Sequence, residues 1–290
     1  MAKTLDCALC ILRQSLEAAR FATPDESLQK EILEKTMRTS LEMGLDYDPP
    51  MMGTILHRIV RETTGDPDPY YKEKRRHNRL ALERIDVVRR WIADSTDRFE
   101  TAVRLAIAGN SIDLALGRLD QKAVDEAIRK AVDQPVSGDF GELRGVIDDA
   151  STILYLTDNA GEIVYDRLFV ELLTSEDYGK KVTVAVRGKP ILNDALLEDA
   201  EEAGITEVAP TIGNGGDGLG TIFSLTSPEF NELFASADLV LAKGLANYET
   251  LGVGPREITP KKIAFLFKAK CPFIAARCGA KLGDLVVRLQ

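Results

Sequence analysis

The hydrophobic positions follow two different periods along the chain. Up to about residue 134, apolar residues recur every three or four positions, as in DESLQKEILEKTMRTSLEM and LALERIDVVRRWIAD, which is the spacing of amphipathic helices. From about residue 151, short apolar runs alternate with helical segments, which is typical of strand–helix–strand units. The pattern predicts a helical N-terminal part followed by an α/β part.

Six apolar runs in the second part are predicted strands: TILYL, VTVAV, TEVAPTI, DLVLA, PFIAA and DLVVRL. Parallel strands need crossover helices, so this alternation predicts a mostly parallel, doubly wound α/β sheet that is covered on both faces. The stretch DQPVSGDFGELRG reads as a connection. We therefore predict a helical domain over residues 1–147 and an α/β domain over residues 148–290.

Composition narrows the function classes. A formal net charge of −9 argues against a nucleic-acid partner, and no stretch approaches the roughly 18 apolar residues of a membrane span. Charges spread through MAKTLDCALCILRQ do not fit a signal peptide, so we expect a cytoplasmic protein. The 4 cysteines are too few for a disulfide framework, and the 2 histidines exclude a three-histidine zinc site. A catalytic metal would have mainly oxygen ligands, which favours Mg²⁺ or Mn²⁺.

Polar residues collect where the predicted strands end. The first strand is followed by Asp158 and Asn159, the second by Asn193 and Asp194, the third by a glycine-rich loop, and the fourth by Lys243 and then Asn247. Ligands of open parallel sheets bind at the carboxyl ends of the strands, and carboxylates with carboxamides suit Mg²⁺ or Mn²⁺. Each pair taken alone also fits an ordinary helix cap.

The glycine-rich loop formally matches the dinucleotide-binding pattern at Gly213, Gly215 and Gly218. That pattern should follow the first strand of its unit and have an acid at the end of the next strand. Here the loop follows the third strand, and Asp238 precedes its strand. A plain turn is the better interpretation.

Several motifs in register resemble a known family. YLTDNAGEIVYD, VRGKPILNDA, ADLVLAKGLANYETL, FLFKAKCP and GDLVV, with an N-terminal CALC and a helical AGNSID, are similar to the metal-dependent damage-control phosphatases, whose eukaryotic members are the acidic-residue methyltransferase-like proteins. The resemblance covers nearly the whole chain. It implies a helical part packed on an α/β domain, and hydrolysis of phosphate monoesters of small metabolites, sugar phosphates among them, with a divalent metal (Mn²⁺, Mg²⁺, Co²⁺ or Ni²⁺).

The resemblance also assigns residues. Metal ligands would be Asp158, Asn159 and Asp194, and Asp158 would be catalytic together with Lys270, which matches the phosphate-binding lysine of the family's R-T-x-K motif. The substrate contacts implied by the motifs are Asn110, Asp113, Glu162, Asn247, Tyr248 and Lys270. Lys243 directly ends a strand, so we expect it either to point into the cleft as a further substrate contact or to pair with a nearby carboxylate, and Arg187 and Lys189 rank lower as anion contacts.

Three features depart from the family pattern or add to it. Phe267 and Lys268 stand where the family motif has Arg and Thr, and Leu245 stands where eukaryotic members have Asp. Cys7 and Cys10 place the chain with the microbial subfamily that has CxxC. This pair could be half of a second metal site, a redox pair, or two small buried residues.

The sequence leaves the mechanism and two rival classes open. Either water or the Asp158 carboxylate could attack the phosphoryl group, with Lys270 neutralising charge. A methyltransferase that uses S-adenosylmethionine is the nearest alternative, although its glycine-rich loop belongs after the first strand. A non-enzymatic metal-binding protein is the other.

Overall fold

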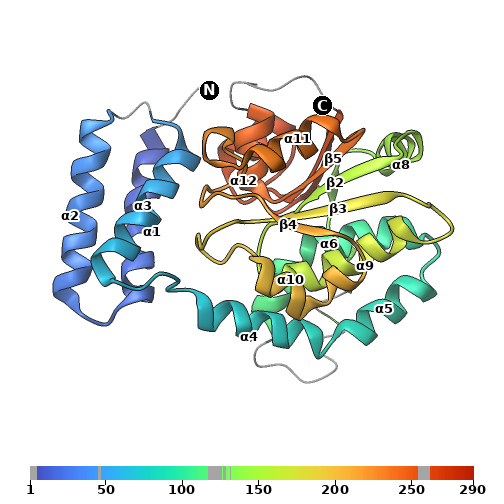
Figure 1. Cartoon of the computed structure of the whole chain (residues 1–290), viewed down its shortest axis with the longest axis horizontal. Helices are drawn as coiled ribbons and strands as arrows, with labels where there is room; N and C mark the ends of the chain where they lie inside the picture. The colour runs from blue at the N-terminus through green and yellow to red at the C-terminus, as the bar shows by residue number, and fades with distance from the viewer. Residues whose placement is uncertain (1–4, 45–46, 117–125, 127–128, 131, 254–261) are drawn as a thin grey trace.

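The computed structural model describes the chain outside residues 1–4, 45–46, 117–125, 127–128, 131 and 254–261, and describes α6 by its backbone alone from residue 110 to 116 (Figure 1). The N-terminal helices are α1 (Leu5–Ala22), α2 (Glu26–Glu42), α3 (Pro49–Thr64), α4 (Tyr71–Leu82), α5 (Ile85–Asp94) and α6 (Arg98–Leu116). No helix in this described part is both long and apolar enough to cross a bilayer.

Helices α1 to α3 form a lobe that stands beside the sheet, with α4 running from it under the rest of the molecule (Figure 1). Local signals set their ends: the Asp25 side chain accepts N–H bonds at the start of α2, Pro49 begins α3, and Gly65 ends α3 in the left-handed conformation. Ala19, Ile32 and Leu56 are fully buried where the three helices meet.

Among the described residues, seven strands form one sheet in the order β1-β7-β6-β5-β2-β3-β4. The strands are β1 (Val136–Ser137), β2 (Thr152–Leu156), β3 (Lys181–Val186), β4 (Thr211–Gly213), β5 (Leu239–Lys243), β6 (Lys262–Lys268) and β7 (Leu285–Leu289). All neighbouring pairs are parallel except β6 and β7, which are antiparallel. The predicted α/β class with a mostly parallel sheet is confirmed.

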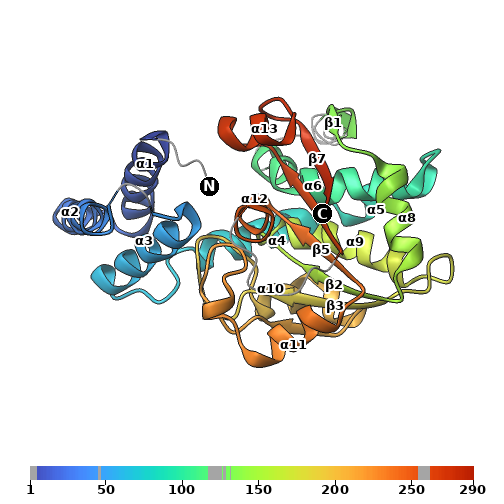
Figure 2. The ribbon, with the colours of Figure 1, turned by 90° about the horizontal axis from the view of Figure 1, so that it is seen from above.

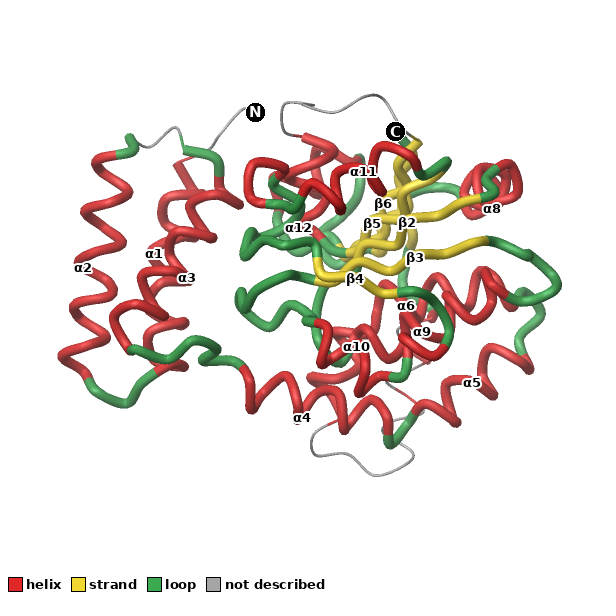
Figure 3. Tube along the Cα trace, viewed as in Figure 1, coloured by secondary structure: helices red, strands yellow, loops and turns green. Residues whose placement is uncertain are grey.

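Helices cover both faces of the sheet (Figure 3). Further helices are α8 (Phe140–Asp149), α9 (Glu162–Thr174), α10 (Leu197–Ala203), α11 (Pro228–Ser236), α12 (Leu245–Asn247), the π-helix η3 (Tyr248–Val253) and α13 (Pro272–Cys278), with 3-10 turns at Ile205–Glu207 and Phe223–Leu225. Alternate residues of β2 face opposite clusters: Tyr155 packs with α6 and α9, whereas Leu154 packs with α11 and α13.

Two predicted strands differ from the structure. PFIAA belongs to helix α13, in which Pro272 takes the first position. Proline is well tolerated there because the N–H that it lacks would have no partner within the helix, and the alanines that follow favour a helix. TEVAPTI is a 3-10 turn followed by only the short strand β4. Strand β6, KIAFLFK, was not among the six predicted runs.

Residues on the two sides of the predicted domain boundary pack against one another. Strand β1 precedes residue 148 and pairs with β7, and Ala81 of α4 and Phe99 of α6 lie in the same hydrophobic cluster as the strands. The boundary at 147/148 stays a prediction from the change of period. In the structure, the α1–α3 lobe is the part that stands apart from the sheet (Figure 2).

Strand β2 is the point where the direction of winding changes. The chain passes from β2 to β3 and β4 on one side, then returns to β5 and β6 on the other side of β2. In open α/β sheets ligands bind at the carboxyl ends of the strands beside such a point, and we name this edge of the sheet, formed by the loops after β2, β3 and β5, the crevice. The first residues after β2 are therefore the place to look for a site.

Candidate functional site

The loops that follow β2 and β3 are joined by their backbones. Asn159 and Asp194 form an isolated antiparallel bridge, and the N–H of Ala195 donates to the carbonyl of Asp158 at 2.9 Å. These bonds fix the distance between the two loops independently of their side chains. The three predicted metal ligands Asp158, Asn159 and Asp194 are thereby brought together at the crevice.

Helix capping does not explain these three residues. Helix α9 begins after Gly161 without a side-chain cap, and at the start of α10 the N–H of Leu196 donates to Asp199. The Asn159 amide instead donates to Asp158 Oδ2 at 2.9 Å. This bond turns the two neighbouring side chains toward each other.

Asp158 lies in a strongly acidic environment. Burial, together with the nearby carboxylates of Asp194 and Glu162, raises the pKa of Asp158 to about 8, against the smaller opposing effects of Lys270 and Arg187. Burial also raises the pKa of Asp194. Carboxylates enclosed this closely repel one another, and the arrangement favours a bound cation.

Arg187 is the first residue after β3 and holds one of these carboxylates. Its Nε donates to Asp194 Oδ2 at 2.7 Å, and the two residues are only 4% and 2% exposed. Arg187 Nη2 is enclosed and finds no hydrogen-bond partner in the described part of the chain. The guanidinium therefore has a donor to spare beside Asp194.

Lys243 lies in a buried charge cluster directly behind the crevice. Its Nζ donates to Glu162 at 2.5 Å, to Asp166 at 2.7 Å and to the carbonyl of Ala106 in α6 at 2.6 Å, while the Tyr155 hydroxyl also donates to Asp166. Burial disfavours the ammonium charge, but the two carboxylates outweigh it and raise the pKa of Lys243. Lys243 thus fixes Glu162 and ties α6 to the sheet.

Two further predicted substrate contacts are enclosed. The Asn247 amide donates to the carbonyl of Lys243 at 2.7 Å, and its oxygen accepts from the Thr221 hydroxyl at 2.9 Å. Tyr248 is 2% exposed and stacks on Phe267 with ring centroids 4.8 Å apart. Both side chains support the loop after β5 here, and their contact with a substrate stays a prediction.

Two lysines lie at the end of β6: Lys268 is its last residue, and Lys270 follows two positions later. Lys270 is exposed, yet it is close enough to oppose the rise in the pKa of Asp158. Lys268 is partly buried, and burial and Lys270 both lower the pKa of Lys268. Lys270 is therefore accessible to an anion at the edge of the crevice.

The remaining predicted residues lie away from the crevice or have side chains outside the described part of the structure. Asn110 and Asp113 belong to α6, but their side chains lie outside the described part of the structure. Cys7 is half-buried and Cys10 exposed on α1, and burial, then Cys271 and Cys7, raises the pKa of the Cys10 thiol. Among described residues, no three or more His, Cys, Asp or Glu side chains are arranged as a metal site.

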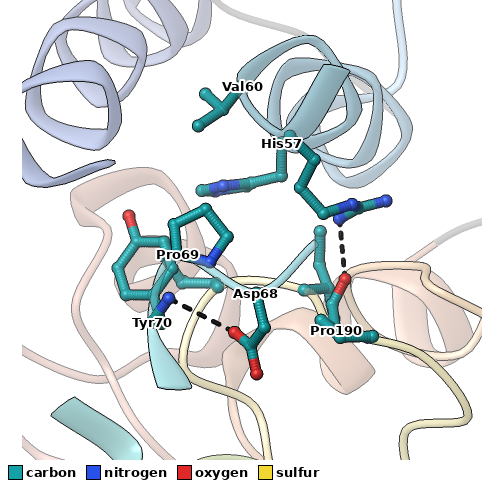
Figure 4. A pocket seen from close by; sticks show the side chains of 9 residues that line it. His57, Val60, Asp68, Pro69, Tyr70 and Pro190 are labelled. Carbon is teal, nitrogen blue, oxygen red and sulfur yellow. Dashed lines mark hydrogen bonds between the residues drawn. The ribbon is translucent and has the colours of Figure 1, made fainter. Parts of the chain in front are cut away.

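The lobe is fastened to the crevice loops through α3. Arg58 and Arg61 both pair with Asp217 of the glycine-rich loop, and Arg61 also donates to the carbonyl of Pro190 at 2.7 Å. Figure 4 shows the bond to Pro190 beside a small pocket that His57 also lines. Burial and Arg61 lower the pKa of His57 to about 4, so this histidine is neutral at physiological pH. No predicted site residue lines this pocket.

Sequence reasoning missed Asp166 and gave Arg187 a low rank. Asp166 lies four residues after Glu162 within the otherwise apolar EIVYDRLFVELL, so the two carboxylates share one face of α9. That spacing, together with Lys243 at the end of an apolar strand, was a signal for a buried ion cluster. Arg187 gives a similar signal, because it directly follows the apolar strand β3.

Comparison with known proteins agrees with the fold. A family model described as the damage-control phosphatase ARMT1-like domain matches residues 4–286. An uncharacterized protein of Methanocaldococcus jannaschii is 37% identical over 97% of this chain and 93% of its own length, and a damage-control phosphatase of Archaeoglobus fulgidus is 33% identical over 98% and 97%. A crystal structure of a DUF89 family protein from Pyrococcus horikoshii matches with a TM-score of 0.87 and 30% identity, covering 98% of this chain and 97% of that one. The chain belongs to the damage-control phosphatase family with the ARMT1-like domain.

Proposed function

We propose that this protein is a divalent-metal-dependent phosphatase that hydrolyses phosphate monoesters of small metabolites, sugar phosphates or related damaged metabolites among them. One observation carries the proposal: Asp158, Asn159 and Asp194 converge at the carboxyl end of β2, where burial and mutual repulsion raise the pKa of Asp158 to about 8. The names of the relatives support a phosphatase at the level of the family.

The donor set suits a hard divalent ion. Asp158 and Asp194 supply carboxylate oxygens, and Asn159 supplies a carboxamide oxygen, since its nitrogen donates to Asp158. A cation between them would offset the burial and the repulsion that raise the pKa of Asp158. Mg²⁺, Mn²⁺, Co²⁺ and Ni²⁺ are the ions to test.

In phosphoryl transfer, the residues of the crevice would have different roles. A bound divalent ion supplies Lewis-acid stabilisation of the charge on the phosphoryl oxygens. Lys270, exposed at the edge, neutralises charge on the same group. The nucleophile is either water or the Asp158 carboxylate; in the second case a phosphorylated aspartate forms as the alcohol leaves, and water then hydrolyses it.

A phosphatase screen tests the proposal. Purified protein is incubated with sugar phosphates and cofactor phosphates, with each of the four metals or with a chelator, and released phosphate is measured. We expect metal-dependent release that Asp158→Ala abolishes. Silence across the panel, combined with tight binding of S-adenosylmethionine, would favour the methyltransferase alternative. Metal binding without either activity would favour a non-enzymatic metal-binding protein.

A second metal at the CxxC motif is a separate part of the proposal. Cys7 and Cys10 supply two thiol donors, and Cys271 is close enough to raise the pKa of Cys10. A further donor would have to move onto the ion, since no complete ligand set is formed among the described residues. Metal analysis of Cys7→Ser beside the parent tests it: loss of one bound metal supports the site, and equal metal content refutes it.

A further inference from the structure

The guanidinium of Arg187 is only partly used by the protein. Its Nε holds Asp194, whereas Nη2 is enclosed with no acceptor among the described residues. A buried charged donor without a partner is costly, and native proteins rarely leave one in place unless a ligand or water completes it. Arg187 is 4% exposed, so bulk solvent does not serve this nitrogen freely.

The backbone around Arg187 fixes where this donor lies. The N–H of Arg187 donates to the carbonyl of Ala195 at 2.9 Å, which ties it to the loop that carries Asp194. On its other side, Gly188 packs so closely on Gly215 that an added β-carbon would lie 2.4 Å from the Gly215 nitrogen. The glycine-rich loop therefore closes against the chain at this point, and Arg187 cannot easily withdraw from the acidic crevice.

The charge around Arg187 indicates the kind of ligand. Backbone bonds join the loop that carries Asp158 to the loop that carries Asp194, so Arg187, which binds Asp194, lies at the same edge of the sheet as both carboxylates. With a divalent ion held between those carboxylates, the group that approaches Arg187 would be an anion bound at the same ion. A tetrahedral phosphoryl group fits, because its several oxygens can be shared between a metal and a planar guanidinium.

We infer that Arg187 is a phosphoryl-binding residue of this site: Nε orients the ligand Asp194, and Nη2 donates to an oxygen of the substrate's phosphate group. The inference rests on the proposed phosphatase function and adds a cation to Lys270. The competing explanation is that Arg187 only positions Asp194. The two explanations differ in whether the loss of Arg187 can be overcome by saturating metal.

Two variants separate them. In Arg187→Lys all N–H donors lie on one nitrogen, so a lysine that pairs with Asp194 does not also place a donor at the position of Nη2, whereas Arg187→Gln removes the charge. Arg89→Gln is the matched control, because Arg89 also pairs with a carboxylate, Glu171, but on the surface of α5 and α9. Thermal unfolding shows that each variant is folded, and Arg187→Lys keeps the test open if Arg187→Gln does not fold.

The measurements are Mn²⁺ affinity by calorimetry, and inorganic phosphate binding by calorimetry in saturating Mn²⁺. For Arg187→Lys we expect phosphate affinity to fall by about tenfold or more while Mn²⁺ affinity stays within about threefold of the parent, as for a lost charged hydrogen bond. The control should match the parent in both. The inference is overturned if Arg187→Lys and Arg187→Gln bind phosphate as tightly as the parent does in saturating Mn²⁺. It is also overturned if the parent binds no phosphate.

These outcomes are separate from those of the proposed function. If the parent binds phosphate through Arg187 but hydrolyses no monoester, the phosphatase proposal fails and the binding residue stands. If the parent is a metal-dependent phosphatase and Arg187→Lys retains its KM and its phosphate affinity, the function stands and the inference fails.

Discussion

The α-carbon of Gly244 lies directly against the carboxylate of Asp158. A β-carbon added at residue 244 would lie 2.2 Å from Asp158 Cγ and 2.3 Å from Oδ2. Gly244 follows β5 and has φ +83°, a conformation that side chains rarely adopt. The ends of β2 and β5 therefore meet through this pair, and the absence of a side chain at residue 244 leaves the space that Asp158 occupies.

Gly244→Ala should move the proposed metal ligand. The methyl group must displace either Asp158 or the backbone after β5, and a shift of about 1 Å at a catalytic group can cost about 100-fold in rate. We expect a loss of about 10- to 100-fold in metal-dependent kcat/KM, with about 1–3 kcal/mol lost from the free energy of unfolding through backbone strain. Phosphate release and denaturant unfolding measure the two effects.

Gly179→Ala separates strain from displacement. Gly179 also has a positive φ, +62°, but an added β-carbon there meets nothing within 4 Å. This control should lose stability without losing kcat/KM beyond about twofold, since it touches no site residue. Equal activity losses in the two variants would contradict the proposed role of the Gly244–Asp158 contact.

Asp158→Asn should stabilise the metal-free protein at neutral to alkaline pH while removing its response to metal. The pKa of Asp158 is raised to about 8, so the fold binds this proton more tightly than the unfolded chain does. The carboxyl group therefore costs stability as pH rises from about 4 to 8, and an amide removes that cost. Near pH 8 with a chelator, we expect the variant to be more stable by at least about 1 kcal/mol.

The metal response supplies the second measurement. Mn²⁺ should raise the unfolding temperature of the parent, because it binds only the folded state, and should have little effect on Asp158→Asn. Asp25→Asn is the control, since Asp25 is an exposed cap of α2 far from the crevice in sequence and should leave the response intact. A full Mn²⁺ shift in Asp158→Asn would remove Asp158 from the ligand set.

The sequence predicted which residues lie close together where polar residues directly follow neighbouring strands of the sheet. The convergence of Asp158, Asn159 and Asp194 could be predicted because the carboxyl ends of adjacent parallel strands meet, and the backbone bridge between Asn159 and Asp194 brings them together; their role as metal ligands stays a prediction. The same reasoning placed Lys243 at a strand end, but its side chain points to Glu162 and Asp166 behind the crevice. Which face a terminal strand residue takes depends on register, which the apolar run does not specify.

Other features depend on contacts between distant segments. PFIAA is as apolar as a strand, and only Pro272 at the first helical position indicates a helix. The enclosure of Asn247 and Tyr248, whose contact with a substrate stays a prediction, comes from Thr221 and Phe267, which lie elsewhere in the chain. No local pattern shows that Arg58 and Arg61 reach across to Asp217.

Lys243→Met should destabilise the protein, more at high pH than at low pH. The ammonium is 0% exposed and neutralises Glu162 and Asp166, so its loss leaves carboxylates buried without a cation, at a cost of about 3–5 kcal/mol near pH 8. The pKa of Asp166 is already about 6 and rises further without Lys243. The folded variant then takes up protons as pH falls, so the deficit should shrink near pH 5.

Denaturant unfolding at the two pH values measures this deficit. Lys262→Met is the control: Lys262 is an exposed lysine at the start of β6 whose contact with Asp149 is 3.5 Å, and its loss should cost less than about 1 kcal/mol at either pH. A Lys243→Met protein that unfolds like Lys262→Met would show that the buried cluster contributes little to stability.

Asp217→Asn should weaken the attachment of the α1–α3 lobe, with a stability deficit that closes only at acidic pH. Hydrogen bonds from Arg58, helped by Arg61 and opposed by burial, lower the pKa of Asp217 from 3.8 to about 2. A lowered pKa gives stability that is complete above the unfolded value and is lost as pH falls through the folded one. The parent should thus exceed the variant by about 1–2 kcal/mol above pH 5, and the difference should close between about pH 4 and pH 2.

Proteolysis shows where the attachment fails. Asp217 is the point at which two arginines of α3 meet the glycine-rich loop, so its loss should expose the lobe to cleavage before the sheet unfolds. Asp97→Asn removes a carboxylate that pairs with Arg144 at 2.8 Å, within the part of the chain that packs on the sheet, and should not release the lobe. If both variants are cleaved at the same rate and sites as the parent, Asp217 does not hold the lobe. If only Asp217→Asn is cleaved around α3, the ion pairs of Arg58 and Arg61 are what keep the lobe against the crevice loops.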